Sequence, residues 1–297
     1  MKNKNFITLL DIPKKDLENI ILRAIELKEM TKLGITYTPL QNKTLALLFD
    51  KSSTRTRVSF EVGMTHFGGN TLFLSPKDTQ LGRGEPIEDT AKVISSMVDC
   101  IVIRTHKHED ILKFCENSSV PVINGLTELV HPCQLLADIM TFRETKGSIK
   151  NKKVAWIGDA NNMCNSYIHA ALQFDFNLSI ATPEKLIPSL YKKNSGIMLS
   201  HDPFVAAKNA DLIVTDVWTS MGQEKEQEER KKIFKNFQVN EKIMNVANKK
   251  AIFMHCLPVH RGEEVTSKIL NNKKSVVWQE AENRLHAQKA LLEYLLV

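Results

Sequence analysis

Residues 45–60 read LALLFDKSSTRTRVSF, and this stretch decides the fold. Its first five residues are apolar, which predicts a buried strand, and apolar side chains at helical spacing follow over about 55–67. The same order, a short apolar run and then a helical pattern, recurs along almost the whole chain. This alternation is typical of βαβ units, in which helices connect parallel strands.

The apolar runs form two sets, separated by a break at Lys146-Gly147-Ser148. In chain order, the expected strands are 45–49, 71–74, 101–103, 120–123, 154–157, 178–180, 212–214, 252–254 and 276–278. We therefore expect an α/β fold with two Rossmann-like parallel-sheet domains, flanked by helices and joined by interdomain helices. The domains should span 1–132 and 147–280. A helix over about 132–145 should join them, and a C-terminal helix, 281–297, should pack back on the first domain.

The composition of the 297 residues excludes several classes of protein. A hydrophobic fraction of 42% argues against a disordered chain, and no apolar stretch approaches the roughly 18–20 residues of a membrane span. Asp11 interrupts the apolar residues near the amino terminus too early for a signal-peptide core, so we expect a cytoplasmic protein. The five cysteines lack CxxC spacing, which favours reduced thiols.

The net charge of +6 is compatible with nucleic acid, a membrane surface or small anions as partners. The charged run over 225–232 mixes both signs at helical spacing, so we expect a solvated helix face there. A nucleic-acid-binding module would need an arginine-rich stripe or an aromatic platform, and neither is evident. A nicotinamide oxidoreductase is disfavoured because the turn Gly158-Asp159-Ala160-Asn161-Asn162 lacks the GxGxxG pattern. We expect no nucleic acid and no membrane as partner.

Hydroxyl and arginine side chains crowd the start of the helix that follows strand 45–49. The residues concerned are Ser53, Thr54, Arg55 and Thr56. At a helix start the backbone N–H groups are unpaired and the helix dipole has its positive end, so this position suits a phosphate or a carboxylate. The alternative is a capped helix start with exposed arginines. Arg104, at the end of a strand, and His131 with Gln134, at a helix start, point to the same sheet edge. The alternatives are a surface arginine and a histidine that only caps the helix. GxxxxGK[ST] is absent, so no nucleotide P-loop is expected.

Polar residues also follow the strands of the second domain. Asn161 and Asn162 follow one strand, and Asp216 and the Ser220-Met221-Gly222 turn follow another. A carboxylate can pair with an ammonium group, and the turn offers hydroxyl and N–H groups to a carboxylate. These residues therefore form a candidate amino-acid clamp; the alternative is that Trp218 and Met221 are core residues.

The neighbours His255 and Cys256 invite comparison with cysteine proteases. Neighbouring residues of an extended chain point to opposite faces, so we expect no nucleophilic Cys–His pair. Further ligands at metal spacing are missing from the sequence, so we expect no metal site.

Several motifs, in this order, resemble those of the aspartate/ornithine carbamoyltransferase family over essentially the entire chain. They are Ser53-Thr54-Arg55-Thr56, Gly82-Arg83-Gly84-Glu85-Pro86, His131-Pro132-Cys133-Gln134, Asp216-Val217-Trp218-Thr219-Ser220-Met221-Gly222, His255-Cys256-Leu257-Pro258 and Glu280-Ala281-Glu282-Asn283-Arg284. The motifs that begin at Asp216 and His255 resemble the ornithine branch in particular. Asp50, where the family more often has Glu, and the variable residues 259–261 are departures that do not affect the reaction.

For carbamoyl phosphate, the resemblance implies a site based on the first domain. Its residues would be Ser53, Thr54, Arg55, Thr56, Gln80, Arg104, His131, Gln134, Cys256, Leu257 and Arg284. The first four of these would hold the phosphate, and Arg104 would bridge the phosphate and the carbonyl oxygen. His131 would help to polarise the carbonyl. Gln134, Arg284 and the backbone near Cys256 would face the carbamoyl nitrogen, while Gln80 would reach a neighbouring subunit's site.

For L-ornithine, the resemblance implies a site in the second domain. Asn162 and the Ser220-Met221 turn would bind its α-carboxylate, and Asp216 its ammonium group. Cys256 would lie beside the side-chain amine. The implied catalytic residues are Arg55, Arg104, His131, Cys256 and Arg284.

The resemblance thus implies carbamoyl transfer from carbamoyl phosphate to the δ-amine of L-ornithine in arginine metabolism, without a metal or an organic cofactor. It also implies a homotrimer or a multiple of trimers. Either the region of Asp216 and Cys256 or the substrate phosphate would assist deprotonation of the amine. The alternative is a carbamoyltransferase that acts on another amine, such as putrescine, which lacks the α-carboxylate.

Overall fold

The computed structural model describes residues 4–75, 84–193, 196–219 and 227–297. The chain divides into two compact units. Unit 1 comprises Met1–Met140 and Glu282–Val297, and unit 2 comprises Thr141–Ala281. Each unit is built around its own parallel sheet, so the predicted α/β fold with two parallel sheets is confirmed.

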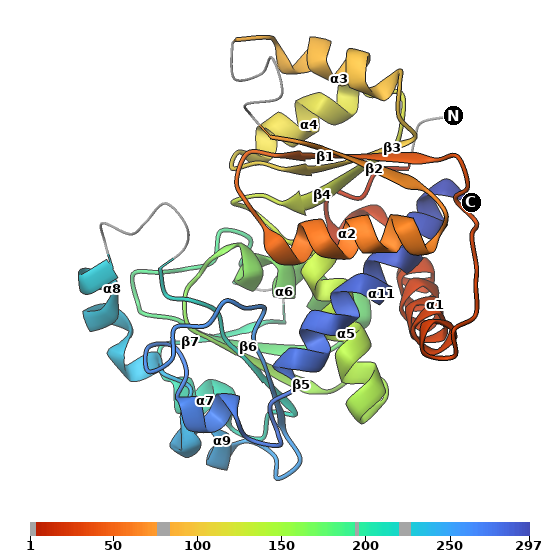
Figure 1. Ribbon diagram of the computed structural model, residues 1–297. Coiled ribbons are helices and arrows are strands. Elements are labelled where there is room, and N and C mark those ends of the chain that lie inside the picture. The colour runs from red at the N-terminus through yellow and green to blue at the C-terminus, as the bar shows by residue number, and fades with distance from the viewer. Residues whose placement is uncertain (1–3, 76–83, 194–195, 220–226) are drawn as a thin grey trace. The chain divides into compact units, whose positions relative to one another are not determined.

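The sheet of unit 1 has the strand order β2-β1-β3-β4 (Figure 1). Its strands are β1 (Thr44–Phe49), β2 (Asn70–Leu74), β3 (Cys100–Arg104) and β4 (Val122–Leu126). Five of the six β1 residues are buried, as expected for an interior strand covered on both faces. The register pairs Leu45 with Cys100 and Phe49 with Arg104, so β1 and β3 end at the same edge.

Helices cover both faces of this sheet (Figure 1). They are α1 (Lys14–Lys32), α2 (Thr54–His66), α3 (Ile87–Ser95) and α4 (His108–Asn117). Ala46 and Leu48 of β1 pack in one apolar cluster with Ala91 of α3 and Phe114 of α4. Because side chains alternate along a strand, Leu45 and the other odd-numbered residues of β1 face the opposite side, where α2 lies.

The sheet of unit 2 has the strand order β7-β6-β5-β8-β9. Its strands are β5 (Lys153–Ile157), β6 (Asn177–Ala181), β7 (Met198–Ser200), β8 (Leu212–Val214) and β9 (Ile252–Met254). The accompanying helices are α6 (Asn162–Phe174), α7 (Pro203–Ala207), α8 (Gln227–Phe234), α9 (Glu241–Val246) and α10 (Ser267–Leu270). Ala155 packs with residues of α7 and α9 in one core, while Trp156 contacts Tyr167 of α6 on the other face, 5.6 Å between ring centroids.

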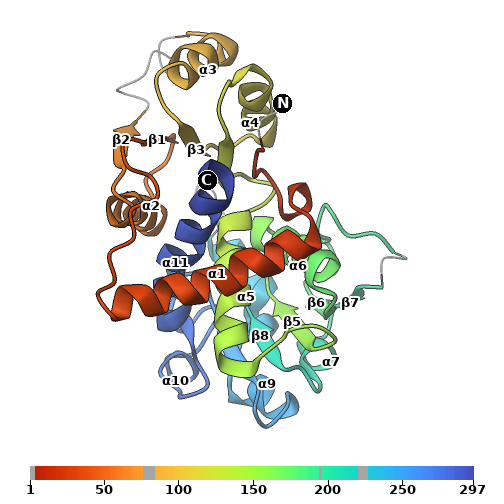
Figure 2. The ribbon, with the colours of Figure 1, turned by 90° about the vertical axis from the view of Figure 1, so that its right-hand side faces the viewer.

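Two helices run from one unit into the other (Figure 2). Helix α5 (Pro132–Lys146) starts in unit 1 and ends in unit 2, whereas α11 (Val277–Leu296) starts in unit 2 and ends in unit 1. Within unit 1, Glu293 of α11 accepts two hydrogen bonds from Arg23 of α1, at 2.7 and 3.0 Å. Among the described residues, every helix is too short or too polar to cross a membrane.

Some of the predicted elements were wrong. Residues 276–278 do not form a strand: Val276 makes a backbone hydrogen bond with Phe253, and α11 begins at Val277. The β-branched and aromatic composition of residues 276–278 suggested a strand. Trp278 instead lies on the first turn of a helix, where it is 61% exposed. The fourth strand is displaced from 120–123 to Val122–Leu126. Helix α1 and strand β7 were not predicted.

Candidate active site

The first turn of α2 follows β1 and lies at the carboxyl edge of the sheet of unit 1. Ser53 is the N-cap of this helix, and its hydroxyl accepts a hydrogen bond from the Thr56 N–H at 3.4 Å. Thr54 is exposed, Arg55 is half-buried and Thr56 is buried. The first N–H groups of a helix have no partner within it, so this turn offers donors and a positive dipole to an anion.

A buried cationic cluster lies in unit 1. Arg104 ends β3 and His131 directly precedes α5; both side chains are buried. Burial lowers the pKa of His131 well below its usual value of 6.5, and the charges of Arg284, Arg104 and Arg55 lower this pKa further. The imidazole is therefore neutral near pH 7, in surroundings whose positive charge favours an anionic ligand.

Arg284 links two other predicted residues of unit 1, Gln134 and Thr56. Its Nη1 donates to Gln134 Oε1 at 2.6 Å, and its Nη2 donates to Thr56 Oγ1 at 3.1 Å. All three side chains are at most 3% exposed. Helix α11 thus brings a guanidinium from near the end of the chain to the starts of α2 and α5.

Two residues of this network were not predicted. Asp138 is 1% exposed and its Oδ1 accepts a hydrogen bond from Gln134 Nε2 at 2.9 Å. Gln288, with its amide oxygen turned toward the guanidinium, accepts from Arg284 Nη2 at 2.8 Å. Their positions four residues after Gln134 and Arg284 place them on the same helix faces, a spacing that could have revealed them.

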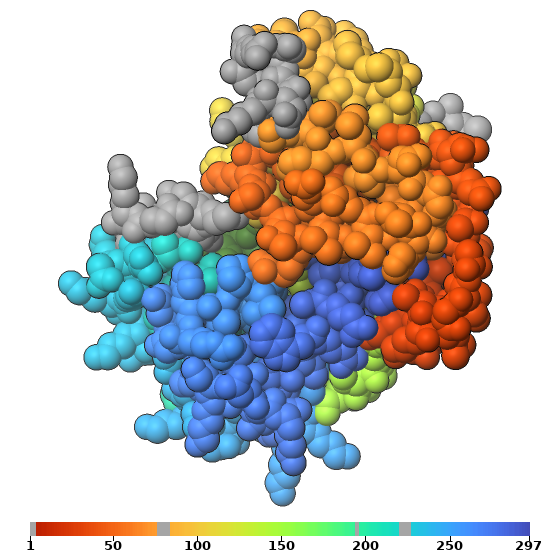
Figure 3. Space-filling view, in the orientation of Figure 1, coloured from red at the N-terminus to blue at the C-terminus, as the bar shows by residue number. Residues whose placement is uncertain are grey.

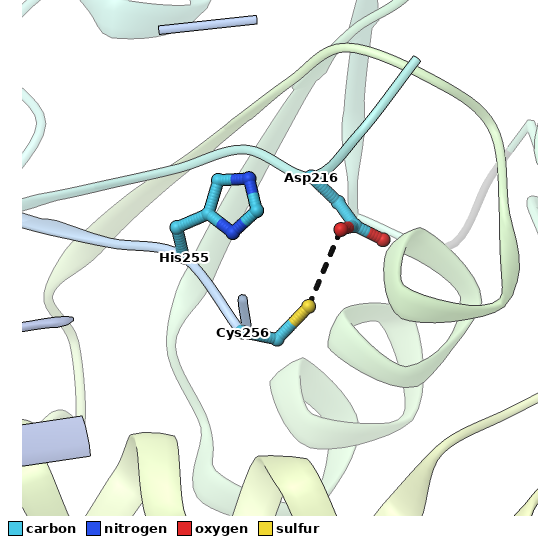
Figure 4. Close-up of side chains that lie close together, drawn as sticks. All are labelled: Asp216, His255 and Cys256. Atoms are coloured by element: carbon cyan, nitrogen blue, oxygen red, sulfur yellow. Dashed lines mark hydrogen bonds between the residues drawn. The ribbon is translucent and has the colours of Figure 1, made fainter. Parts of the chain in front are cut away.

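In unit 2, Asp216 follows β8 and is 7% exposed (Figure 4). Its Oδ2 accepts a hydrogen bond from Asn161 Nδ2 at 2.8 Å, and its Oδ1 accepts from the thiol of Cys256 at 3.3 Å. The structure therefore brings together Asp216 and Cys256, which are 40 residues apart in the sequence. Asn162, the first residue of α6, is half-buried, and Asn161 is the cap of this helix.

The ring of His255 is engaged on both sides. Its Nδ1 accepts a hydrogen bond from the Leu257 N–H at 2.9 Å, and its Nε2 pairs with Glu264 Oε1 at 3.0 Å. Candidate ligand atoms of Asp216, His255 and Cys256 lie within 4.8 Å of one another. A metal ion at this cluster would have to displace an existing bond of the imidazole, because both ring nitrogens are already used.

Three of the predicted ligands, Gln80, Ser220 and Met221, lie outside the described residues. Leu257 is half-buried, with a φ of 57° in the left-handed region.

The prediction of a solvated face for the charged run is wrong at Arg230. This side chain is buried and forms a 2.7 Å ion pair with Asp159, whereas Glu229 and Lys232 of the same helix are exposed, as predicted.

Comparisons with known proteins cover nearly the full length of the chain. The carbamoyl-P binding domain of the aspartate/ornithine carbamoyltransferase family matches residues 4–144, and its Asp/Orn binding domain matches residues 150–295. The ornithine carbamoyltransferase of Hydrogenovibrio crunogenus is 59% identical over 299 residues, which is 100% of this chain and 99% of that protein. The ornithine carbamoyltransferase of Nitrosococcus oceani is 56% identical and covers 99% of this chain and 97% of its own length.

Solved structures give the same result. The ornithine carbamoyltransferase from Burkholderia thailandensis superposes with a TM-score of 0.92 at 49% identity, and covers 99% of both chains. The enzyme of the same name from Pyrococcus furiosus has a TM-score of 0.93 at 47% identity, and covers 99% of this chain and 97% of its own. Both family domains and these full-length similarities agree: the chain belongs to the aspartate/ornithine carbamoyltransferase family.

Proposed function

We propose that this chain transfers the carbamoyl group of carbamoyl phosphate to the δ-amine of L-ornithine, giving L-citrulline and phosphate for arginine metabolism. Asp216 is the observation that carries the choice of acceptor. It is a buried carboxylate that Asn161 and Cys256 hold at the end of β8, and it is suited to bind an ammonium group. An additional carboxylate, as in aspartate, would be repelled there.

Carbamoyl phosphate binds to unit 1 in this proposal. Ser53, Thr54, Arg55 and Thr56 hold the phosphate at the start of α2, where the helix contributes N–H donors and its dipole. Arg104 bridges the phosphate and the carbonyl oxygen. Gln134 and Arg284, already hydrogen-bonded to each other, face the carbamoyl nitrogen together with the backbone near Cys256 and Leu257. Gln80 is a ligand donated to a neighbouring subunit's site.

The electrostatics of unit 1 support a role in stabilising negative charge. The ornithine nitrogen attacks the carbamoyl carbon, and the bond from that carbon to the phosphate oxygen breaks after an oxyanion has formed. Neutral His131 can donate a hydrogen bond to the carbonyl oxygen, while Arg55 and Arg104 stabilise the leaving phosphate. No electrons pass to an acceptor, so the reaction needs no redox cofactor.

L-Ornithine binds to unit 2 in this proposal. Asp216 binds its α-ammonium group, Asn162 and the turn at Ser220-Met221 bind its α-carboxylate, and Cys256 lies beside the reacting amine. The hydrogen bond between Cys256 and Asp216 supports this division of roles, because it places the thiol next to the carboxylate that anchors the amino acid. The amine loses its proton either to this region or to the substrate phosphate.

We further propose that the enzyme works in the cytoplasm as a homotrimer or a multiple of trimers. The family resemblance supports this assembly. Exposed apolar side chains in the α2–β2 segment, which forms a broad part of the surface of unit 1 in Figure 3, are compatible with subunit contacts: Val58 is 51% exposed and Leu72 is 46% exposed. Light scattering of the purified protein tests the assembly size.

A citrulline assay with a panel of amine acceptors tests the proposed activity. We expect citrulline from ornithine, and much slower turnover of putrescine, because putrescine has no α-carboxylate for Asn162. Arg55→Ala should lower the rate by about 10²–10³, the typical loss for one preorganised donor, while the exposed Lys113→Ala on α4 should match the unmodified protein. A protein that makes no citrulline, or that turns over putrescine as well as ornithine, would contradict the proposal.

A further inference from the structure

Arg230 is a buried cation in a helix whose neighbouring charged residues are mostly exposed. Only 9% of the residue is accessible, although it belongs to α8, which begins Gln227-Glu228-Glu229. Burying a guanidinium is unfavourable unless its charge and its donors are matched by partners. The partners of this side chain therefore indicate what its burial achieves.

Those partners lie in two different strand-end loops of unit 2. The Nη2 of Arg230 forms an ion pair with Asp159 Oδ2 at 2.7 Å, and its Nε donates a hydrogen bond to the Trp218 carbonyl oxygen. Asp159 lies in the loop after β5, and Trp218 in the loop after β8. The ion-paired side chains are 11% and 9% exposed, so water screens the pair little.

Each loop carries a residue of the proposed ornithine site. The loop after β5 leads into Asn162, and the loop after β8 contains Asp216 as its second residue. A second link between the loops is the hydrogen bond from Asn161 to Asp216, at 2.8 Å. Arg230 and Asn161 thus join the same two loops at separate points.

Both ends of the Arg230 bridge are themselves fixed. Asp159 Oδ1 accepts a hydrogen bond from the Ala160 N–H at 2.9 Å, and its backbone oxygen accepts from Trp156 Nε1 at 2.9 Å. The Trp218 ring stacks on Phe234 of α8, 5.7 Å between centroids at 15°. Arg230 thus contacts an Asp159 side chain that is tied to the backbone of its own loop, and the backbone of a Trp218 whose ring packs on the same helix as Arg230.

We infer that Arg230 is a positioning residue for the acceptor amino acid: it fixes the loop after β5 against the loop after β8, and so sets the spacing of Asn162 and Asp216. The inference rests on the proposed roles of those two residues in ornithine binding. Loss of Arg230 leaves the Asp159 carboxyl buried without its cation, and burial already raises the pKa of Asp159. Protonation or displacement of Asp159 then loosens the loop after β5.

Steady-state kinetics of Arg230→Gln test this role, with Lys232→Gln as the matched control. Both changes remove one positive charge from α8, but Lys232 is exposed. In Arg230→Gln, the KM for ornithine should rise by about tenfold or more, and the KM for carbamoyl phosphate should stay within about twofold. Lys232→Gln should leave both constants unchanged. An equal change in both constants, or none, for Arg230→Gln would overturn the inference.

Asp159→Asn keeps the test decisive if Arg230→Gln does not fold. The amide is close in size to the carboxylate but removes the ion pair from the other side, so the same selective rise in the ornithine KM is expected. A double variant should lose little more than either single variant, because each already breaks the shared pair. Additive losses would contradict the bridge. Citrulline formation by the unmodified protein, measured in parallel, separates failure of this inference from failure of the proposed activity.

Discussion

The side chain of His131 shows how burial sets protonation in this molecule. It is 5% exposed and lies close enough to Arg284, Arg104 and Arg55 for their charges to lower its pKa in addition to the effect of burial. The uncharged ring can act as a hydrogen-bond donor without adding a further cation to the cluster. The same property makes the stability of the fold depend on pH.

We predict that the fold loses stability as the pH falls below about 6.5, partly through His131. The unfolded chain binds a proton there, whereas the folded chain stays neutral until well below that pH. The unfolded state therefore binds more protons, and its free energy falls relative to that of the folded state. Each pH unit within this window costs up to about 1.4 kcal/mol.

The drop in melting temperature between about pH 7.5 and about pH 5.5 measures this contribution. It should be smaller in His131→Gln than in the unmodified protein. The control His106→Gln removes an exposed histidine and should keep the full drop. Equal drops in the unmodified protein and His131→Gln would show that His131 does not contribute.

Residues of the site differ in how far the sequence could predict them. Thr56, Gln134 and Arg284 were predicted from motifs, and the structure places Arg284 within hydrogen-bonding distance of the other two. The burial of Arg230 was not predicted, because a run of mixed charges at helical spacing is normally solvated. Nothing in the run itself distinguishes one buried residue from its exposed neighbours. The burial of Arg230 depends on Asp159, a partner 71 residues away that only the folded sheet brings near.

At the scale of secondary-structure elements, one residue at the start of α2, Ser53, has both a structural and a proposed binding role. The Ser53 hydroxyl caps the helix and belongs to the proposed phosphate site. Stability and ligand binding can be separated there, because aspartate is as good a cap as serine but carries the wrong charge for an anion site.

We predict that the Ser53→Asp variant keeps the stability of the unmodified protein but binds carbamoyl phosphate much more weakly. Its carboxylate can replace the cap, so the melting temperature should stay close to that of the unmodified protein. The KM for carbamoyl phosphate should rise by about 10²-fold or more through repulsion. Ser53→Ala, which removes the cap, should instead lower the unfolding free energy by about 1 kcal/mol, with a smaller effect on KM. A Ser53→Asp variant that binds carbamoyl phosphate normally would place the phosphate elsewhere.

Prediction of whole elements succeeded where burial produces a clear pattern. The run at 45–49 is apolar because β1 is covered on both faces, and the amphipathic patterns of α3 and α4 reflect one packed side. The pattern misled at 276–278, where β-branched Val276 and Val277 precede a helix. Strand β7, only three residues long and half-exposed, gives too short a signal for its periodicity to be recognised.

At the scale of the whole molecule, α11 is the segment that returns the chain to unit 1. Glu293 is one of its polar anchors: both carboxylate oxygens accept hydrogen bonds from Arg23 of α1, and Oε1 also accepts from the Tyr37 hydroxyl. This anchor lies about two and a half helical turns beyond Arg284, which is held by its own contacts.

We predict that Glu293→Gln lowers the unfolding free energy by about 1–2 kcal/mol, because Arg23 loses its charged, two-point partner. Urea denaturation measures this loss, and both KM values should stay unchanged. Glu26→Gln is the control, since Glu26 pairs with the same guanidinium but its side chain is 63% exposed. Removal of this exposed partner should cost less than about 0.5 kcal/mol. Equal losses in the two variants would contradict a special role for Glu293.

The path of α5 and α11 makes unit 2 an insertion within unit 1. On the ribosome, residues 141–281 are all synthesised before 282–297 emerge, so the second sheet can fold while the first still lacks the helix that carries Arg284. Synthesis of unit 1 thus begins before that of unit 2 but is completed after it. A premature stop after residue 281, within the final helix, would remove part of unit 1 and leave every residue of unit 2 in place.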